Sequence, residues 1–271
     1  MPLNRKVLRT MMANKARYIG SIIMIIICCA LYTAFNFTVP HLQQGLDDYK
    51  SDHAIEDAYF MVQEPLQDLE SWEEEYHLTL EERFSWDYSY NDEATLRILN
   101  EAEKLNRYSV TEGTNIKEKN DILIDPHFAS AHSLHIGDKL PIAGDDYTIQ
   151  GFATTPDYIY MLKTEDEMAP NSNTFGVAIM NKDALEDIGK GHTYYSVKFH
   201  DNNREEVKEE LSETYMVNQW VSQKDNPRIT FIDGKVNAFA QIGMLIPMVI
   251  LVLTCILIAA MIARLLKGEY A

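Results

Sequence analysis

The chain has 271 residues, of which 46% are hydrophobic and 24% are charged, and its formal net charge is −17 at pH 7. This balance is ordinary for a globular protein, but the charged and the apolar residues are distributed unevenly along the sequence. The acidic excess disfavours nucleic acid and anionic lipid surfaces as ligands of the acidic part, because both would be repelled.

The first 17 residues form a basic segment with apolar residues at helical spacings between its cations. Such a segment can lie along a membrane surface, with its cations at the lipid phosphates. It could equally be a plain cytoplasmic extension of the helix that follows, and both interpretations stay open. Its positively charged residues, which no acidic residue accompanies, are Arg5, Lys6, Arg9, Lys15 and Arg17.

An apolar run that could cross a membrane follows at 18–39. Its stretch Ile19–Val39 is 21 residues long, and no charged residue occurs between Tyr18 and Leu46. About 20 helical residues are needed to cross a hydrocarbon core about 30 Å thick. A cleaved signal peptide has a shorter apolar centre and ends at a small-x-small cleavage site, which 36–41 does not provide. We therefore expect a membrane anchor.

Residues 40–238 are expected to form one α+β domain, because short β-rich runs alternate with helical patterns and turn residues. The residues at 143–146 predict a hairpin turn, and Asn181 is a predicted helix cap. The predicted strands are 58–62, 94–99, 121–124, 139–142, 147–152, 175–180 and 193–199. The predicted helices are 65–76, 127–133, 182–187 and 203–215.

A second apolar run at 239–263 precedes a short end, 264–271, that carries Arg264 and Lys267. Since Lys and Arg next to a span stay on the cytoplasmic side, both ends of the chain are predicted to be cytoplasmic. The protein would then be a multi-pass protein of a bacterial plasma membrane with an extracytoplasmic central domain. The 17 basic and 40 acidic residues between the two basic ends give that part a charge of −23, which favours solubility.

Pro247 lies about a third of the way into the second apolar run. It removes one helical hydrogen bond and is expected to kink the helix, so it is a candidate hinge. Membrane helices also tolerate proline without any movement, and this alternative stays open. The three cysteines, Cys28, Cys29 and Cys255, all lie in the apolar runs, so we expect the central domain to fold without disulfides.

No catalytic motif is evident. The sequence has no phosphate-binding loop, no HExxH and no GxSxG, so we expect neither enzyme activity nor a cofactor. His132 and His135 could meet on one helical turn, but zinc needs three or four converging ligands, which favours surface or turn positions. The acidic run 73–75 is interpreted as a solvated face. An aromatic set is interpreted as domain core, although it could also be a partner surface: Tyr158, Tyr160 and Phe175.

The order of basic segment, span, α+β domain and span resembles the beginning of FtsX-like ABC transporter permeases. The stretch 122–162, ILIDPHFASAHSLHIGDKLPIAGDDYTIQGFATTPDYIYML, looks like the core of the family's MacB-type periplasmic domain, and 173–185, NTFGVAIMNKDAL, continues the likeness. The stretch 234–271 resembles the helix that opens the FtsX domain, with Arg264 where the family places a basic residue.

The resemblance implies that a separate cytoplasmic ATPase subunit dimerises on ATP and moves the helices, and that the outer domain receives this motion by mechanotransmission. The outcome in the family is export of a lipid or peptide, or control of an outer protein such as a cell-wall hydrolase. Family permeases continue beyond the second span, so we expect an N-terminal part that needs the remainder of the permease or a second permease copy.

Two other functions fit the same layout. A membrane-anchored receptor or scaffold would bind an outer protein or peptide without transport. A small channel with two helices per subunit is weaker, because neither span offers a polar stripe or a re-entrant selectivity loop.

Overall fold

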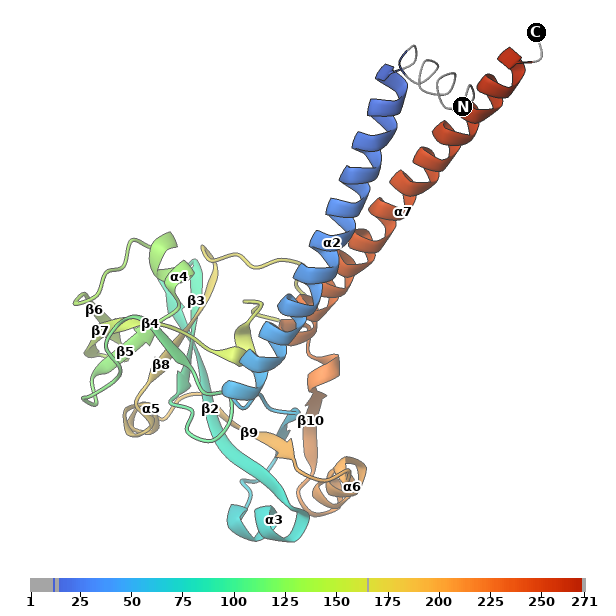
Figure 1. Cartoon of the computed structure of the whole chain (residues 1–271). Coiled ribbons are helices and arrows are strands. Elements are labelled where there is room, and N and C mark those ends of the chain that lie inside the picture. The colour runs from blue at the N-terminus through green and yellow to red at the C-terminus, as the bar shows by residue number, and fades with distance from the viewer. Residues whose placement is uncertain (1–11, 13–14, 165, 270–271) are drawn as a thin grey trace. The chain divides into compact units, whose positions relative to one another are not determined.

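A computed structural model describes residue 12, residues 15–164 and residues 166–269 of the chain. These residues fall into two compact units, one from the two ends of the chain, up to Asp47 and from Gly234, and one from Asp48–Asp233. Two long helices, α2 (Lys15–Asp52) and α7 (Pro227–Glu269), contribute to both units (Figure 1). Each helix continues from one unit into the other without a break.

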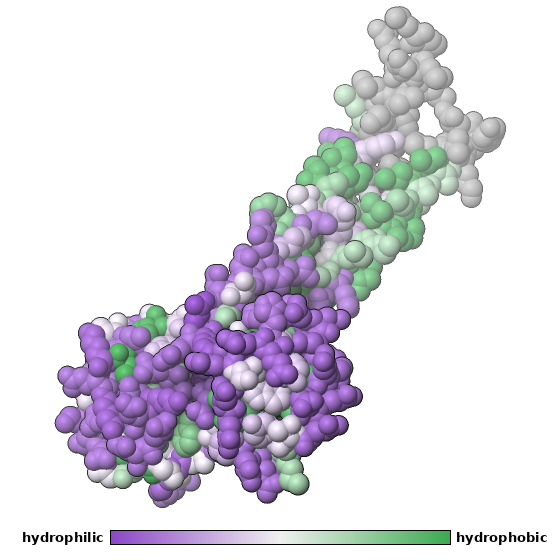
Figure 2. All heavy atoms as spheres, turned by 90° about the horizontal axis from the view of Figure 1, so that it is seen from below, coloured by the Kyte–Doolittle hydropathy of each residue, from purple (hydrophilic) through white to green (hydrophobic). Residues whose placement is uncertain are grey.

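The first unit is the apolar part of these two helices. Both helices are long and apolar enough to cross a membrane. In the most apolar window of each, 6% of the α2 residues and 17% of the α7 residues are buried, whereas the core helix of a soluble protein is mostly buried. Figure 2 shows the corresponding hydrophobic surface along the helices and a predominantly hydrophilic surface on the second unit. The two predicted apolar runs are therefore confirmed as helices of membrane-spanning length.

The second unit, here called the sheet domain, is α+β, as predicted. Within the described residues, ten strands form one mixed sheet in the order β10-β1-β9-β2-β3-β8-β5-β7-β4, with β6 paired to β7. The strands are β1 Ala58–Val62, β2 Leu78–Tyr90, β3 Ala94–Asn100, β4 Ser109–Gly113, β5 Asp121–Ile124, β6 Lys139–Ile142, β7 Asp145–Thr154, β8 Phe175–Met180, β9 His192–Phe199 and β10 Val217–Ser222. The α-helices of the sheet domain are α3 Leu69–Tyr76, α4 Pro126–Ala131, α5 Lys182–Ile188 and α6 Arg204–Thr214, with 3-10 turns η1 Pro156–Tyr158 and η2 Gln223–Asp225.

The chain enters and leaves the sheet domain at neighbouring strands. β1 follows α2, β10 precedes α7, and the two strands are antiparallel partners with Ala58 opposite Ser222. β9 lies on the other side of β1 and joins it to β2, whose register places Arg83 opposite Tyr194. Segments near residues 56, 83, 194 and 226 are therefore brought together, although they are far apart in the sequence.

The two faces of the sheet differ in chemistry. Alternate residues of a strand point to opposite faces, so Leu80 of β2 belongs to one face and Arg83 to the other. On the first face, a cluster around Phe60 includes residues of α3 and α6, and a cluster around Phe128 includes residues of α4 and α5. The other face has small apolar clusters near β5 and β8, but its central part carries buried charged groups.

All seven predicted strands are present, and β1, β5, β6 and β8 have the predicted bounds. Three strands were not predicted, namely β2, β4 and β10. The predicted helix 65–76 begins only at Leu69, because Asp68 caps it by accepting a hydrogen bond from the Ser71 N–H. The predicted hairpin is tighter than expected. Ala143 and Gly144 both have positive φ and make a two-residue turn, so Asp145 and Asp146 begin β7.

Candidate functional site

The residues predicted to face a membrane surface or an ATPase belong to the ends of the two long helices. Lys15 is the first residue of α2 and is exposed. The backbone of Arg17 is helical in α2, and that of Arg264 and Lys267 is helical in α7. Their role stays a prediction. The other predicted residues lie outside the described residues: Arg5, Lys6 and Arg9.

Pro247 lies where α7 contacts α2 within the apolar unit. Helix α7 is unbroken through this residue, and the Pro247 carbonyl accepts a hydrogen bond from the buried Cys28 Sγ at 3.3 Å. Proline removes the helical donor to the carbonyl four residues earlier, which is that of Gly243. A Cβ atom on Gly243 would lie 2.5 Å from the ring of Phe35, so glycine allows the two helices to approach closely here. The hinge role of Pro247 stays a prediction.

An ion pair joins α2 and α7 at the end of each helix that belongs to the sheet domain. Lys50 Nζ lies 2.7 and 2.8 Å from the two carboxylate oxygens of Asp233. The Lys50 side chain is 18% exposed and that of Asp233 36% exposed, so the pair is only partly screened by water. The pair therefore holds the two helices side by side where they join the sheet domain.

Glu56 occupies the link between α2 and β1 and is almost fully buried. Its backbone N–H donates to Asn106 Oδ1 at 3.0 Å, and Asn106 Nδ2 donates back to Glu56 Oε2 at 2.8 Å. Gln223, just before α7, donates its side-chain amide to the Glu56 carbonyl at 2.9 Å. The pKa of Glu56 is raised to about 7. Burial is the largest cause, and the charge of the nearby Asp157 carboxylate is the second.

A cavity of about 410 Å³ lies on the polar side of the sheet domain, and Glu56 is part of its lining. β1, β2, β3, β9 and β10 contribute to it, as do η1, the loop that follows η1, and the start of α7. It is thus an open cavity lined by the strands from the β10 edge of the sheet to β3 and by the segments next to the two long helices.

Two cations of the lining donate to the backbone carbonyl of a third cationic residue, Lys163. Arg97 Nη1 and Arg228 Nη2 donate to the Lys163 carbonyl at 3.2 and 2.9 Å, and Lys163 Nζ donates to Thr95. Both guanidinium groups also lie near the ring of Tyr158, with the Arg228 carbon 4.6 Å from the ring centroid. Arg97 is already neutralised, because Asp87 accepts two of its hydrogen bonds at 2.6 and 2.8 Å.

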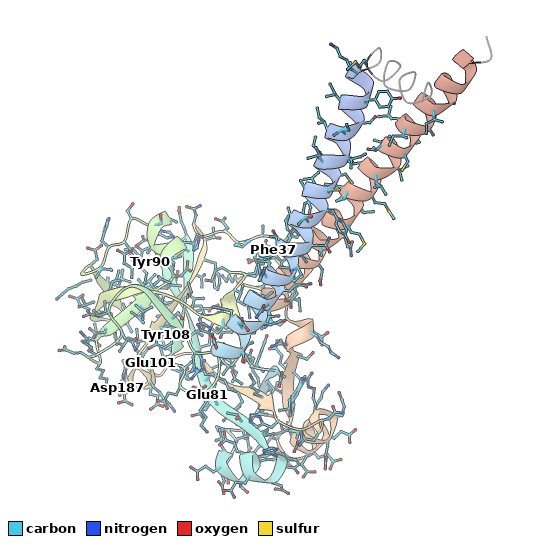
Figure 3. All side chains as sticks on the ribbon, in the orientation of Figure 1. Phe37, Glu81, Tyr90, Glu101, Tyr108 and Asp187 are labelled. Carbon is cyan, nitrogen blue, oxygen red and sulfur yellow. The ribbon has the colours of Figure 1, made fainter. Side chains whose placement is uncertain are left out.

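Acidic groups of the same cavity are buried beside it. Asp157 is 5% exposed and accepts a short hydrogen bond from the Thr155 hydroxyl. Tyr194 is buried too, and burial, opposed by the Arg83 charge, holds its pKa well above the usual range. Glu81, labelled in Figure 3, belongs to another network, because it accepts hydrogen bonds from the backbone N–H groups of residues 103–105.

Arg83 Nη1 is buried on this face and has no hydrogen-bond partner among the described residues. Arg83 lies opposite Tyr194 in the register of β2 and β9, and Ser196, whose hydroxyl interacts with the Glu56 carboxyl group, lies opposite Glu81. Buried polar atoms without a partner are rare in folded proteins, and His132 and Asn203 carry such atoms elsewhere in the sheet domain. On this face, Arg83 Nη1 is therefore a polar group that contacts within the described chain do not satisfy.

The structure does not bring His132 and His135 together as ligands, the alternative that the sequence disfavours. His132 ends α4 and contacts the rings of Phe128 and Tyr90, whereas His135 is exposed next to Asp138. Within the part of the chain that the structure describes, no group of three or more His, Cys, Asp or Glu side chains could hold a metal ion.

The acidic run 73–75 is only partly a solvated face. Glu73 accepts a hydrogen bond from the Leu80 N–H at 2.8 Å and pairs with Lys104 at 2.7 Å. The predicted core role of the aromatic set is confirmed for Tyr158 and Phe175, which are buried. Tyr160 is partly buried and stacks on Phe231.

Of the cavity residues, only Tyr158 was singled out from the sequence, and it was interpreted as core. One signal for the polar face of the sheet was available, since Leu80, Phe84 and Trp86 alternate with Glu81, Arg83 and Ser85 in what proves to be β2. Such alternation is typical of a strand with one polar face. The other cavity residues are single polar positions in links and loops, which no local pattern identifies.

No known family model matches the sequence, and no curated protein matches it either.

Proposed function

We propose that this chain forms the first span, the outer domain and the second span of an FtsX-like ABC transporter permease, and that it couples a separate cytoplasmic ATPase to an extracytoplasmic domain by mechanotransmission. One observation carries the proposal. Helices α2 and α7 each contain residues of the membrane-length apolar unit and residues of the sheet domain.

The junction supports the same function. Lys50 and Asp233 tie the two helices together on the sheet-domain side, and Glu56 is hydrogen bonded both to Asn106 and to the segment that leads into α7. A displacement of either helix would thus act on residues that are fixed within the sheet domain. The MacB-like character of this domain and its position outside the cytoplasm are parts of the proposal, which rests on the sequence resemblance and on the basic chain ends.

Topology is tested by labelling single cysteines in intact cells with a maleimide that does not cross membranes. Ser130 is exposed on α4 and Lys15 is exposed at the start of α2. We expect Ser130→Cys to be labelled in intact cells and Lys15→Cys only after lysis, in a protein whose native cysteines are replaced by Ser. The reverse pattern would place the sheet domain in the cytoplasm and would refute the proposal.

The ATPase partnership is tested by purifying the full-length protein from its native membrane and identifying what accompanies it. An ABC-type ATPase subunit is the expected partner, together with further permease helices or a second permease copy. A chain that never recruits an ATPase is not a permease. In that case the second candidate function, a membrane-anchored binding protein without transport, would remain. The cavity of the sheet domain is the observation that supports this second function.

A further inference from the structure

The cavity of the sheet domain is lined by charged groups of both signs, and the buried carboxyl groups come from other segments than the unpaired cations. Asp166, in the same loop as Lys163, adds an exposed carboxylate to the lining. Lys163 and Arg228 belong to the cationic group, and neither has a carboxylate within ion-pair distance among the described residues. Glu56 and Asp157 form the acidic group, and the described part of the chain provides no ion pair for them either. Burial, strengthened by the Arg97 charge, lowers the pKa of His192, so this residue adds no charge at pH 7.

This arrangement disfavours a ligand with a single kind of charge. A purely anionic ligand would meet two buried carboxyl groups, and a purely cationic one would meet the Lys163 and Arg228 side chains. A ligand that carries both charges satisfies both groups, and charge complementarity of this kind gives specificity. The unpaired Arg83 Nη1 lies on the same face, where the charges of Glu56 and Asp157 act on it.

We propose that the cavity binds a small zwitterion, a free α-amino acid, with its ammonium group at Glu56 and Asp157 and its carboxylate at Lys163 and Arg228. The volume of about 410 Å³ is in the range of small-molecule sites, which bury a ligand among apolar surfaces and a few placed polar groups. Tyr59, Met61 and Tyr158 of the lining provide apolar surface for the side chain of the amino acid.

The position of the two groups adds a role for the ligand. Glu56 follows the last residue of α2 by four positions, and Arg228 is the second residue of α7. An amino acid held between them contacts both segments that lead into the apolar helices, so its binding stabilises one arrangement of these segments. Binding itself requires neither the ATPase nor transport, and its failure would leave the permease proposal untouched.

The test uses the full-length protein in lipid nanodiscs and isothermal titration calorimetry, with each standard amino acid as a separate probe. We expect at least one to bind. Its methyl ester, which lacks the carboxylate, and its N-acetyl derivative, which lacks the ammonium group, should each bind about tenfold or more weakly, since each leaves buried charged groups unpaired. The proposal is overturned if no amino acid binds, or if the blocked derivatives bind equally well.

Two variants locate the site. Lys163→Gln and Glu56→Gln should each weaken binding of the same amino acid by about tenfold or more. The matched controls are Lys139→Gln and Asp146→Asn, an exposed pair outside the cavity, and both should bind like the wild type. Unchanged binding in folded Lys163→Gln and Glu56→Gln proteins overturns the assignment. If either variant fails to fold, as judged by circular dichroism, the blocked derivatives on the wild-type protein still decide the question.

Discussion

The two faces of the sheet both contain fully buried residues and yet differ in their chemistry. Phe60 and Leu96 on one face are 0% exposed, and Arg83 on the other is 1% exposed. The buried clusters of the apolar face consist mainly of side chains that need no partner, whereas Arg83 on the charged face is a buried cation whose Nη1 has no partner among the described residues. Burial alone therefore does not distinguish a stabilising core from a functional one. A polar interior that departs from the rules of stability is expected at a functional site.

The largest effect is expected on the apolar face. Phe60 stacks on Trp220 and Tyr195, with ring centroids 5.2 and 5.5 Å apart, so Phe60→Ala should lower the free energy of unfolding of the sheet domain by about 3–5 kcal/mol. Tyr59, its neighbour on the opposite face, is only partly buried, and Tyr59→Ala should have a clearly smaller effect. Urea unfolding followed by tryptophan fluorescence measures this, because all three tryptophans lie in the sheet domain. Equal losses would contradict the difference between the faces.

The second largest loss of stability is expected when Arg83, the buried cation of the charged face, is replaced. Arg83→Met keeps much of the side-chain volume but leaves the Glu56 and Asp157 carboxyl groups without the Arg83 charge. We expect a loss of about 3 kcal/mol at pH 8, since removal of one partner from a buried charge group is strongly destabilising. The loss should shrink at pH 5, where Glu56 is protonated. A loss that does not depend on pH would show that Arg83 acts by packing only.

Glu56 should give the sheet domain a pH-dependent stability. Because its pKa is raised from 4.5 to about 7, the folded chain binds this proton more tightly than the unfolded chain. The contribution of this proton to the free energy of unfolding is full below pH 4.5, falls between pH 4.5 and 7, and is lost above about pH 7. Glu56→Gln should remove this slope and raise the free energy of unfolding at pH 8 by about 3 kcal/mol, because each pKa unit corresponds to about 1.4 kcal/mol. Parallel pH profiles of variant and wild type would exclude Glu56 as the cause.

The smallest effect is expected at the junction of the helices. Lys50 and Asp233 are partly exposed, so their coupling energy should be about 0.5–1 kcal/mol. A double-mutant cycle with Lys50→Gln and Asp233→Asn measures it, and the coupling should fall in 1 M salt. A coupling of several kcal/mol would mean that the junction, like the charged face, excludes water.

Sequence reasoning succeeded where one local pattern decides the structure. The strand Phe175–Met180 is buried throughout and appears in the sequence as a continuous β-rich run. The two long helices are equally plain, because about 20 apolar residues in a row allow few other structures. The Asn181 cap is also local, since its side chain accepts from the N–H of Asp183, two residues on.

The candidate site was missed for the opposite reason. β2 carries Glu81, Glu82 and Arg83 in its middle, and charged residues are rare at buried strand positions, so the segment does not look like a central strand. The cavity also depends on strand order. β1, β9 and β2 are neighbours in the sheet but not in the sequence, and no single-sequence pattern specifies that pairing.

The pairing of β1 with β10 has a mechanical consequence. Because Ala58 faces Ser222, α2 and α7 connect to the same end of this strand pair, and β10 is the edge strand of the sheet. A force that separated the two helices would break the β1–β10 hydrogen bonds one after another, starting at Ala58 and Ser222. A force along both helices in the same direction would act on all these hydrogen bonds at once. The Lys50–Asp233 bond lies ahead of that end in both helices. If the proposed mechanotransmission operates, this ion pair would oppose the peeling of β10 from the sheet.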